Sequence, residues 1–98
     1  MADAADKTQA EAWVAAEIAH WREVPYSELV AREGEALHAA LDDADGNPWV
    51  LETQIFWDDG KKENIRVMVD VWNPRRLIST STAIDSFIRA PDGSFVGE

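Results

Sequence analysis

The chain has 98 residues, of which 46% are hydrophobic, with five Trp, no Cys and a formal net charge of −10. This length fits one domain with a single core, and the missing cysteines exclude disulfides, thiolate metal sites and cysteine nucleophiles. Nineteen acids against nine bases disfavour binding to nucleic acid or to an anionic membrane, because both need clustered Lys and Arg.

The charge is distributed unevenly along the chain. Residues 1–45 contain eleven acids and three bases, whereas residues 46–98 contain eight acids and six bases. An acidic first half permits a basic protein partner. Residues 1–12 are polar and acidic where a secretory signal needs a basic start and an apolar run, and no segment has the apolar length to cross a bilayer. We therefore expect a cytoplasmic protein.

The first third of the chain has a helical pattern. Thr8 and Glu11 have the spacing of a capping box, which predicts a helix over residues 9–23 that Pro25 ends. Pro25 can also open a short second helix, which Gly34 would stop. The apolar residues of the first helix recur on one face: Ala10, Trp13, Val14, Ile18 and Trp21.

The segment from Trp49 to Trp72 predicts a β-hairpin, because two alternating apolar runs flank a polar loop that contains Asp-Gly. If Trp57 faces Ile65, then Glu52 lies opposite Asp70. A shift of two residues keeps the same core face and separates these carboxylates, so both registers stay open. The core face of the two strands is predicted by parity: Trp49, Leu51, Thr53, Ile55, Trp57, Ile65, Val67, Val69 and Val71.

Other strands are less clearly marked. Residues 35–41 have helical propensity, but they also alternate and precede a turn, so a strand is favoured there. Residues 77–82 are rich in Ser, Thr and Ile and predict a further strand, whereas residues 82–87 have the capping-box spacing of a short helical turn. The type I turn signal at residues 90–93 should fold Phe95 and Val96 back beside Phe87 and Ile88.

Three stretches of the second half carry a family resemblance. IFWDD at residues 55–59, RVMVDV at 66–71 and DSFIRAPDGSFVGE at 85–98 resemble the later half of a group of small uncharacterised bacterial domains. The resemblance covers about half the chain and carries no catalytic motif. It implies a bacterial cytosolic origin without implying an activity.

These patterns together predict an α+β fold. One or two N-terminal helices should pack on a three- to four-stranded antiparallel meander. Residues 1–7 are expected to be a disordered N-terminus, followed by a single α+β domain over residues 8–98.

The paired carboxylates Glu52 and Asp70 are one candidate site. Across neighbouring strands they could share a proton, bind a ligand or hold a divalent ion, although only His38 offers a third ligand on the same sheet. The acidic turn at residues 42–46 has part of the spacing of a calcium loop, but Leu41 occupies its first ligand position. No nucleophile elbow or phosphate loop is present. We therefore predict no catalytic residue, no metal site and no cofactor.

The other candidate is the outward face of the hairpin, where Phe56, Arg66, Met68 and Trp72 lie by parity. This face is more apolar than a solvated sheet face should be, so either the C-terminal segment covers it or a partner does. The leading hypothesis is a non-enzymatic protein-interaction module, as a homodimer or with a basic protein partner. The alternative is a metal- or ligand-binding domain or an enzyme that uses Glu52 and Asp70.

Overall fold

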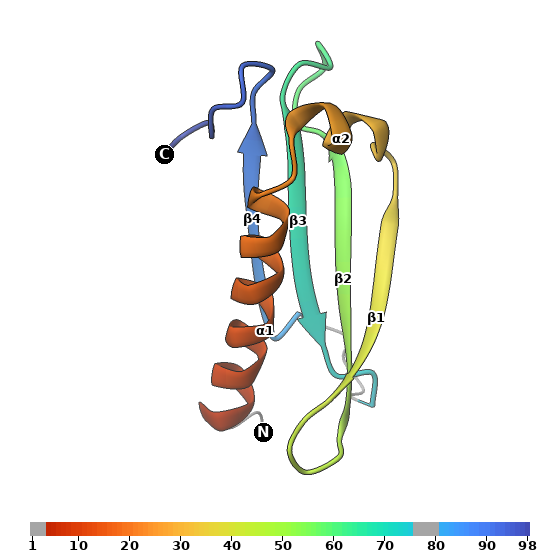
Figure 1. Ribbon diagram of the computed structural model, residues 1–98. Helices are drawn as coiled ribbons and strands as arrows, with labels where there is room; N and C mark the ends of the chain where they lie inside the picture. Colours follow the sequence, from red (N-terminus) through yellow and green to blue (C-terminus); the bar gives the residue numbers. More distant parts are fainter. Residues whose placement is uncertain (1–3, 76–80) are drawn as a thin grey trace.

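The computed structural model describes residues 4–75 and 81–98 and shows two helices against one antiparallel sheet (Figure 1). The predicted α+β class is confirmed. The four strands follow the chain order β1-β2-β3-β4 across the sheet. The elements are α1 (Ala4–Arg22), α2 (Tyr26–Ala31), β1 (Ala36–Asp42), β2 (Pro48–Trp57), β3 (Ile65–Trp72) and β4 (Ala83–Arg89).

Helix α1 begins at Ala4, earlier than the expected start at Gln9. The prediction that Thr8 caps the helix is therefore wrong, because Thr8 lies inside it. Residues 4–7, which were expected to be disordered, are helical. Alanine is the strongest helix former, and Asp6 in the first turn interacts favourably with the helix dipole. These two preferences extend the helix beyond the capping signal.

Helix α2 starts after Pro25, whose backbone is extended at φ −62° and ψ 151°. Gly34 adopts a φ of +89°, a left-handed conformation that favours glycine and ends the helical segment as expected. Leu29 from α2 is fully buried and anchors the short helix on the core. Neither α1 nor α2 has the length and hydrophobicity of a membrane-crossing helix.

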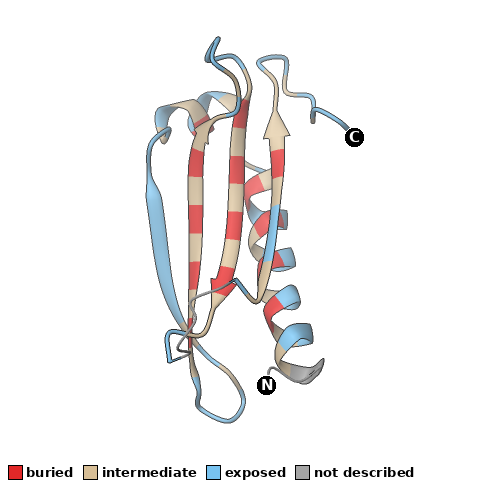
Figure 2. Ribbon diagram, turned by 180° about the vertical axis from the view of Figure 1, so that it is seen from behind, coloured by how far each residue is buried: buried red, intermediate tan, exposed pale blue. Residues whose placement is uncertain are grey.

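The predicted hairpin is formed by β2 and β3, and its register is the one that places Trp57 opposite Ile65 and Glu52 opposite Asp70. Burial alternates strictly along β3, as Figure 2 shows by its banded colouring. Every second residue of β3 is completely buried: Ile65, Val67, Val69 and Val71. One face of the hairpin is therefore the core, as the parity of the sequence predicts.

The ambiguous segment after Gly34 is a strand, β1, as favoured from its alternation. Of its seven residues all except Leu41 are nevertheless exposed. The reason is that α1 packs mainly on β3 and β4, toward the opposite edge of the sheet. β1 is thus an edge strand with little cover on either face.

The last strand, β4, runs from Ala83 to Arg89 and pairs with β3. The alternative of a helical turn at residues 82–87 is wrong, because residues 83–89 pair with β3 one after another. Phe87 lies opposite Val67 and is buried in the core. Of the strand expected at residues 77–82, residues 77–80 lie outside the described part, and Ser81 and Thr82 precede β4.

Residues 90–98, here called the C-terminal strap, fold back against the helical side of the sheet. The Gly93 N–H donates to the Ala90 carbonyl at 2.9 Å, which closes the predicted turn. The Phe95 ring then meets the Phe87 ring at 5.6 Å between centroids. The predicted return beside Phe87 is confirmed, but the strap lies on the core side and does not cover the outward face.

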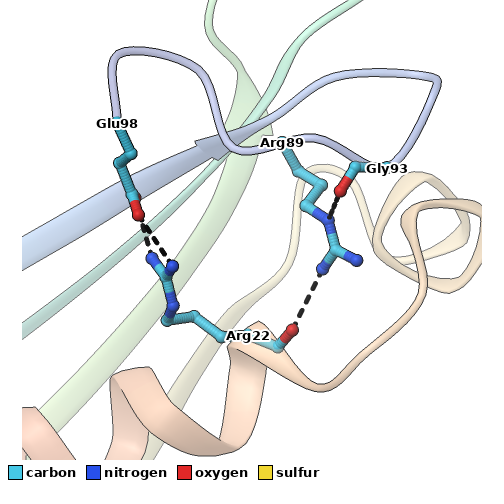
Figure 3. A network of polar contacts seen from close by, with 4 residues as sticks. All are labelled: Arg22, Arg89, Gly93 and Glu98. Carbon is cyan, nitrogen blue, oxygen red and sulfur yellow. Dashed lines mark hydrogen bonds and ion pairs between the residues drawn. The ribbon is translucent and has the colours of Figure 1, made fainter.

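Two arginines tie the C-terminal strap to the end of α1 (Figure 3). Arg22 donates to both carboxylate oxygens of Glu98 at 2.7 and 2.8 Å, and its guanidinium lies 3.8 Å from the Phe95 ring centroid. Arg89 donates to the carbonyls of Gly93 at 2.7 Å, Arg22 at 3.1 Å and Val24 at 3.0 Å. The strap, β4 and α1 are therefore one packed unit.

Candidate functional site on the bare face of the sheet

The sheet has one covered face and one face over which no described helix or strand lies (Figures 1 and 2). We call the second the bare face. On β2, β3 and β4 its side chains are those that alternate with the core residues: Val50, Glu52, Gln54, Phe56, Arg66, Met68, Asp70, Trp72, Ile84, Ser86 and Ile88.

Apolar side chains occupy much of the bare face. Phe56, Met68 and Trp72 are half-buried by their neighbours within the sheet alone. Ile84 on β4 is 56% exposed, the highest value among the large hydrophobic side chains described as exposed. Three of the four residues predicted for the interaction surface therefore lie together with a further aliphatic residue that the sequence did not single out.

The fourth predicted residue, Arg66, is held in place by two neighbours. Its Nε donates to Asp58 Oδ1 at 2.8 Å, and its Nη1 donates to Ser86 Oγ at 2.7 Å. The ion pair with Asp58 neutralises its charge, and the bond to Ser86 directs the guanidinium across the sheet. Arg66 thus contributes an ordered, charge-compensated side chain.

A polar row crosses the bare face at the level of Glu52. His38 on β1 meets Glu52 on β2, with 2.6 Å between His38 Nε2 and Glu52 Oε2. Gln54 donates to the other carboxylate oxygen of Glu52 at 2.8 Å. The structure thus confirms that His38 shares the sheet with Glu52, and both Glu52 oxygens have partners.

Asp70 continues this row on β3 directly opposite Glu52. Ser81 donates from its Oγ to Asp70 Oδ2 at 2.9 Å. Partial burial raises the pKa of Asp70 above its usual range, the bond from Ser81 lowers the pKa and the negative charge of Glu52 raises it. Within the described ranges, no basic side chain forms an ion pair with Asp70.

An open notch of about 340 Å³ lies at this point, lined by Glu52, Asp70, Trp72 and Ser81. Its wall therefore combines two carboxylates, an indole ring and a hydroxyl. Carboxylates attract a cation by charge and by hydrogen bonding, and an indole face attracts a cation through its quadrupole. The chemistry of this notch suits a guanidinium or an ammonium group.

Other chemistries find less support here. Residues 4–75 and 81–98 hold no group of three or more His, Asp or Glu side chains that could bind a metal ion. In a serine triad the hydroxyl bonds a histidine, whereas Ser81 is bonded to Asp70 and His38 to Glu52. The arrangement is therefore suited to binding a cation.

The acidic turn considered as a calcium loop has a structural explanation. Asp43 accepts hydrogen bonds from the backbone N–H groups of Asp45 and Asn47, both at 2.9 Å, and from the Trp49 indole at 3.1 Å. These donors lower the pKa of Asp43. Its carboxylate stabilises the β1–β2 turn.

Comparison with known proteins does not identify this site. No family model matches the chain, and the comparisons with curated proteins and with solved structures found no match. The resemblance of the C-terminal half to small bacterial domains stays a prediction.

Proposed function

We propose that this protein is a non-enzymatic interaction module that binds a basic protein partner through the bare face of its sheet. One observation supports the proposal most: both helices and the C-terminal strap pack on the opposite face, while Phe56, Met68 and Trp72 lie under no described element. Aromatic residues, Met and Arg are the residues enriched at protein interfaces.

The charge of the bare face favours a basic partner. Arg66 is compensated by Asp58, and Glu52 already contacts His38. Asp70 has a hydrogen bond from Ser81 but no ion pair with a described residue. A protein with a formal net charge of −10 also attracts a basic partner at long range and repels an acidic one.

The notch beside Trp72 would accept one basic side chain of the partner. A Lys or Arg inserted between Asp70 and the indole would gain a charged hydrogen bond and a cation–π contact. The surrounding apolar side chains would exclude water from this contact, as in the centre of a typical interface.

A charge-matched pair of variants tests the proposal. Asp70→Asn and Asp85→Asn each remove one negative charge from neighbouring strands, but Asp85 pairs with Val69 and so lies on the opposite face. We expect Asp70→Asn to weaken binding of an oligo-arginine peptide about tenfold, equivalent to one charged hydrogen bond, and Asp85→Asn to have little effect. Isothermal titration calorimetry would measure both dissociation constants.

Equal weakening by the two variants would show that only net charge attracts the peptide, and the proposal would fail. An oligo-glutamate peptide of the same length serves as the negative control. Trp72→Ala should weaken oligo-arginine binding as well while circular dichroism shows a folded chain. If Trp72→Ala binds like the wild type, the bare face is not the contact surface.

A further inference from the structure

The two edges of the sheet are closed to different degrees. On β4, the Ser86 N–H is taken by Asp85 Oδ1 at 2.8 Å, and the Ile88 carbonyl accepts the Val96 N–H of the C-terminal strap at 2.9 Å. On β1, no described residue pairs with the outer edge, because β1 is the first strand of the sheet order. An open strand edge is a template for another strand.

β1 also lacks the features that usually protect an edge. Lys side chains, proline, bulges and inward-pointing charges prevent strand pairing in natural proteins. Residues 36–41 of β1 read ALHAAL and contain no proline, lysine or acid, and Asp42, its last residue, is the one acid of the strand. In a chain of net charge −10, a stretch of edge without acids of its own lowers the repulsion that a second copy meets there.

The hydrogen-bond pattern shows which backbone groups face the open edge. The Ile55 N–H donates to the Glu35 carbonyl at 3.2 Å, and the Asp43 N–H donates to the Asn47 carbonyl at 3.0 Å. Odd-numbered residues of this segment therefore point their backbone groups toward β2. Because antiparallel ladders alternate, the even-numbered residues point outward: Ala36, His38, Ala40 and Asp42.

The strand is self-complementary in one register. When two copies of β1 run antiparallel with Ala39 opposite Ala39 of the second copy, His38 faces Ala40 and Ala36 faces Asp42. All the outward backbone groups of both strands then form hydrogen-bonded pairs. The same register places Leu37 opposite Leu41 on the helical side, at the closely spaced positions where side chains meet.

The side chains on the helical side of β1 have little cover. Leu37 is 37% exposed, and a groove of about 220 Å³ separates it from Trp13 on α1. Leu41 and Leu51 line the same groove. In the antiparallel register Leu41 of the second copy lies against Leu37, so pairing removes apolar surface from water that the single chain leaves exposed.

We propose that two copies of this chain pair antiparallel through β1, centred on Ala39, and join their four-stranded sheets into one continuous sheet. The two-fold axis is perpendicular to the sheet, so both α1 helices lie on the same side. The bare faces also lie on one common side and stay uncovered. The pairing therefore does not depend on the binding function proposed above.

Sedimentation of matched surface variants tests the pairing. Leu37→Lys places a charge in the paired edge, whereas Ile84→Lys places the same charge on β4 at the other edge, where the aliphatic side chain is more exposed. We expect the wild type and Ile84→Lys to sediment as dimers at tens of micromolar and Leu37→Lys as a monomer. A monomeric wild type, or a dimer lost in Ile84→Lys and kept in Leu37→Lys, would overturn the proposal.

The register is tested by single cysteines, since the natural chain has none. Two Ala39→Cys residues would face each other at the two-fold axis, with Cα atoms about 4.5 Å apart, within reach of a disulfide. Two Leu37→Cys residues would lie about 13 Å apart along the strands and could not bridge. On mild oxidation in dilute solution, Ala39→Cys should form a covalent dimer at least about tenfold faster than Leu37→Cys. Non-reducing gels of samples taken over time would measure both rates. Equal rates would rule out this register, whether or not Leu37→Lys remains folded.

Discussion

The two faces of the same strand, β3, differ sharply. Ile65, Val67, Val69 and Val71 on one face are fully buried under α1, while the residues between them are only partly covered. Both faces belong to one backbone and one register, so the difference comes from what packs on each. The covered face holds the hydrophobic core, and the bare face holds the side chains on which the proposed binding depends.

The largest expected difference between the faces concerns tryptophan. Trp49 is 2% exposed and contacts the Trp13 ring at 5.9 Å, whereas Trp72 lies half-buried on the bare face. Trp49→Ala should lower the free energy of unfolding by about 3–5 kcal/mol because it leaves a large cavity, and Trp72→Ala should cost clearly less. Urea unfolding at one fixed protein concentration measures both. Equal losses would mean that the bare face is as much a part of the core as the covered one.

Arginine gives the next largest difference. Arg89 on the covered side donates to three carbonyls, two of them at the junction after α1, whereas Arg66 on the bare face pairs with the half-exposed Asp58. Arg89→Met keeps the apolar stem but removes these charged hydrogen bonds, and should cost about 2–3 kcal/mol. Arg66→Met, the matched control, should cost about 0–1 kcal/mol. A larger cost at Arg66 would contradict this ranking.

The smallest expected effect has the opposite sign. Because burial raises the folded-state pKa of Asp70 above the unfolded value of about 3.9, ionised Asp70 destabilises the fold at pH 7. This penalty disappears as the pH falls through the folded pKa to below the unfolded one. Asp70→Asn should therefore raise the melting temperature at pH 7 and leave it unchanged at pH 3. A gain of the same size at both values would mean that charge is not the cause.

The same substitution should weaken oligo-arginine binding while it stabilises the chain. A variant that loses binding by unfolding would move both quantities in the same direction. Opposite changes are the usual sign of a residue kept for function at the expense of stability.

The sequence predicted the hairpin and its core face because apolar or β-branched residues recur at every second position on both sides of the loop between Trp49 and Trp72. It left two registers open, since a shift of two residues buries the same side chains. The loop decides between them: the Asp58 N–H donates to the Asn64 carbonyl at 2.8 Å, and Asp59 accepts the Glu63 N–H at 3.0 Å. These local bonds are not visible as a pattern of apolar residues.

Residues 83–89 were not predicted as a strand, since Thr82 and Asp85 have the capping-box spacing of a helical turn over residues 82–87. Pairing with β3 overrides that local signal. The contacts of Glu52 with His38 and of Asp70 with Ser81 could not be predicted either. The first depends on β1 being a strand and the second on where the chain after β3 returns. Polar contacts between distant segments follow from topology, whereas the core face follows from local alternation.

The sequential order of the four strands also has a kinetic consequence. Every strand pairs with its neighbour in the chain, so the meander has mainly local contacts, which favour fast folding. The bonds between Arg22 and Glu98 join residues 76 positions apart, the longest separation among the described hydrogen bonds. Closing a loop of this length costs conformational entropy until the sheet has formed. We expect the strap to dock after the rate-limiting step. In stopped-flow experiments Arg89→Met should then speed unfolding and leave the folding rate nearly unchanged. Slower folding would place the contacts of Arg89 with the strap and with the end of α1 in the folding nucleus.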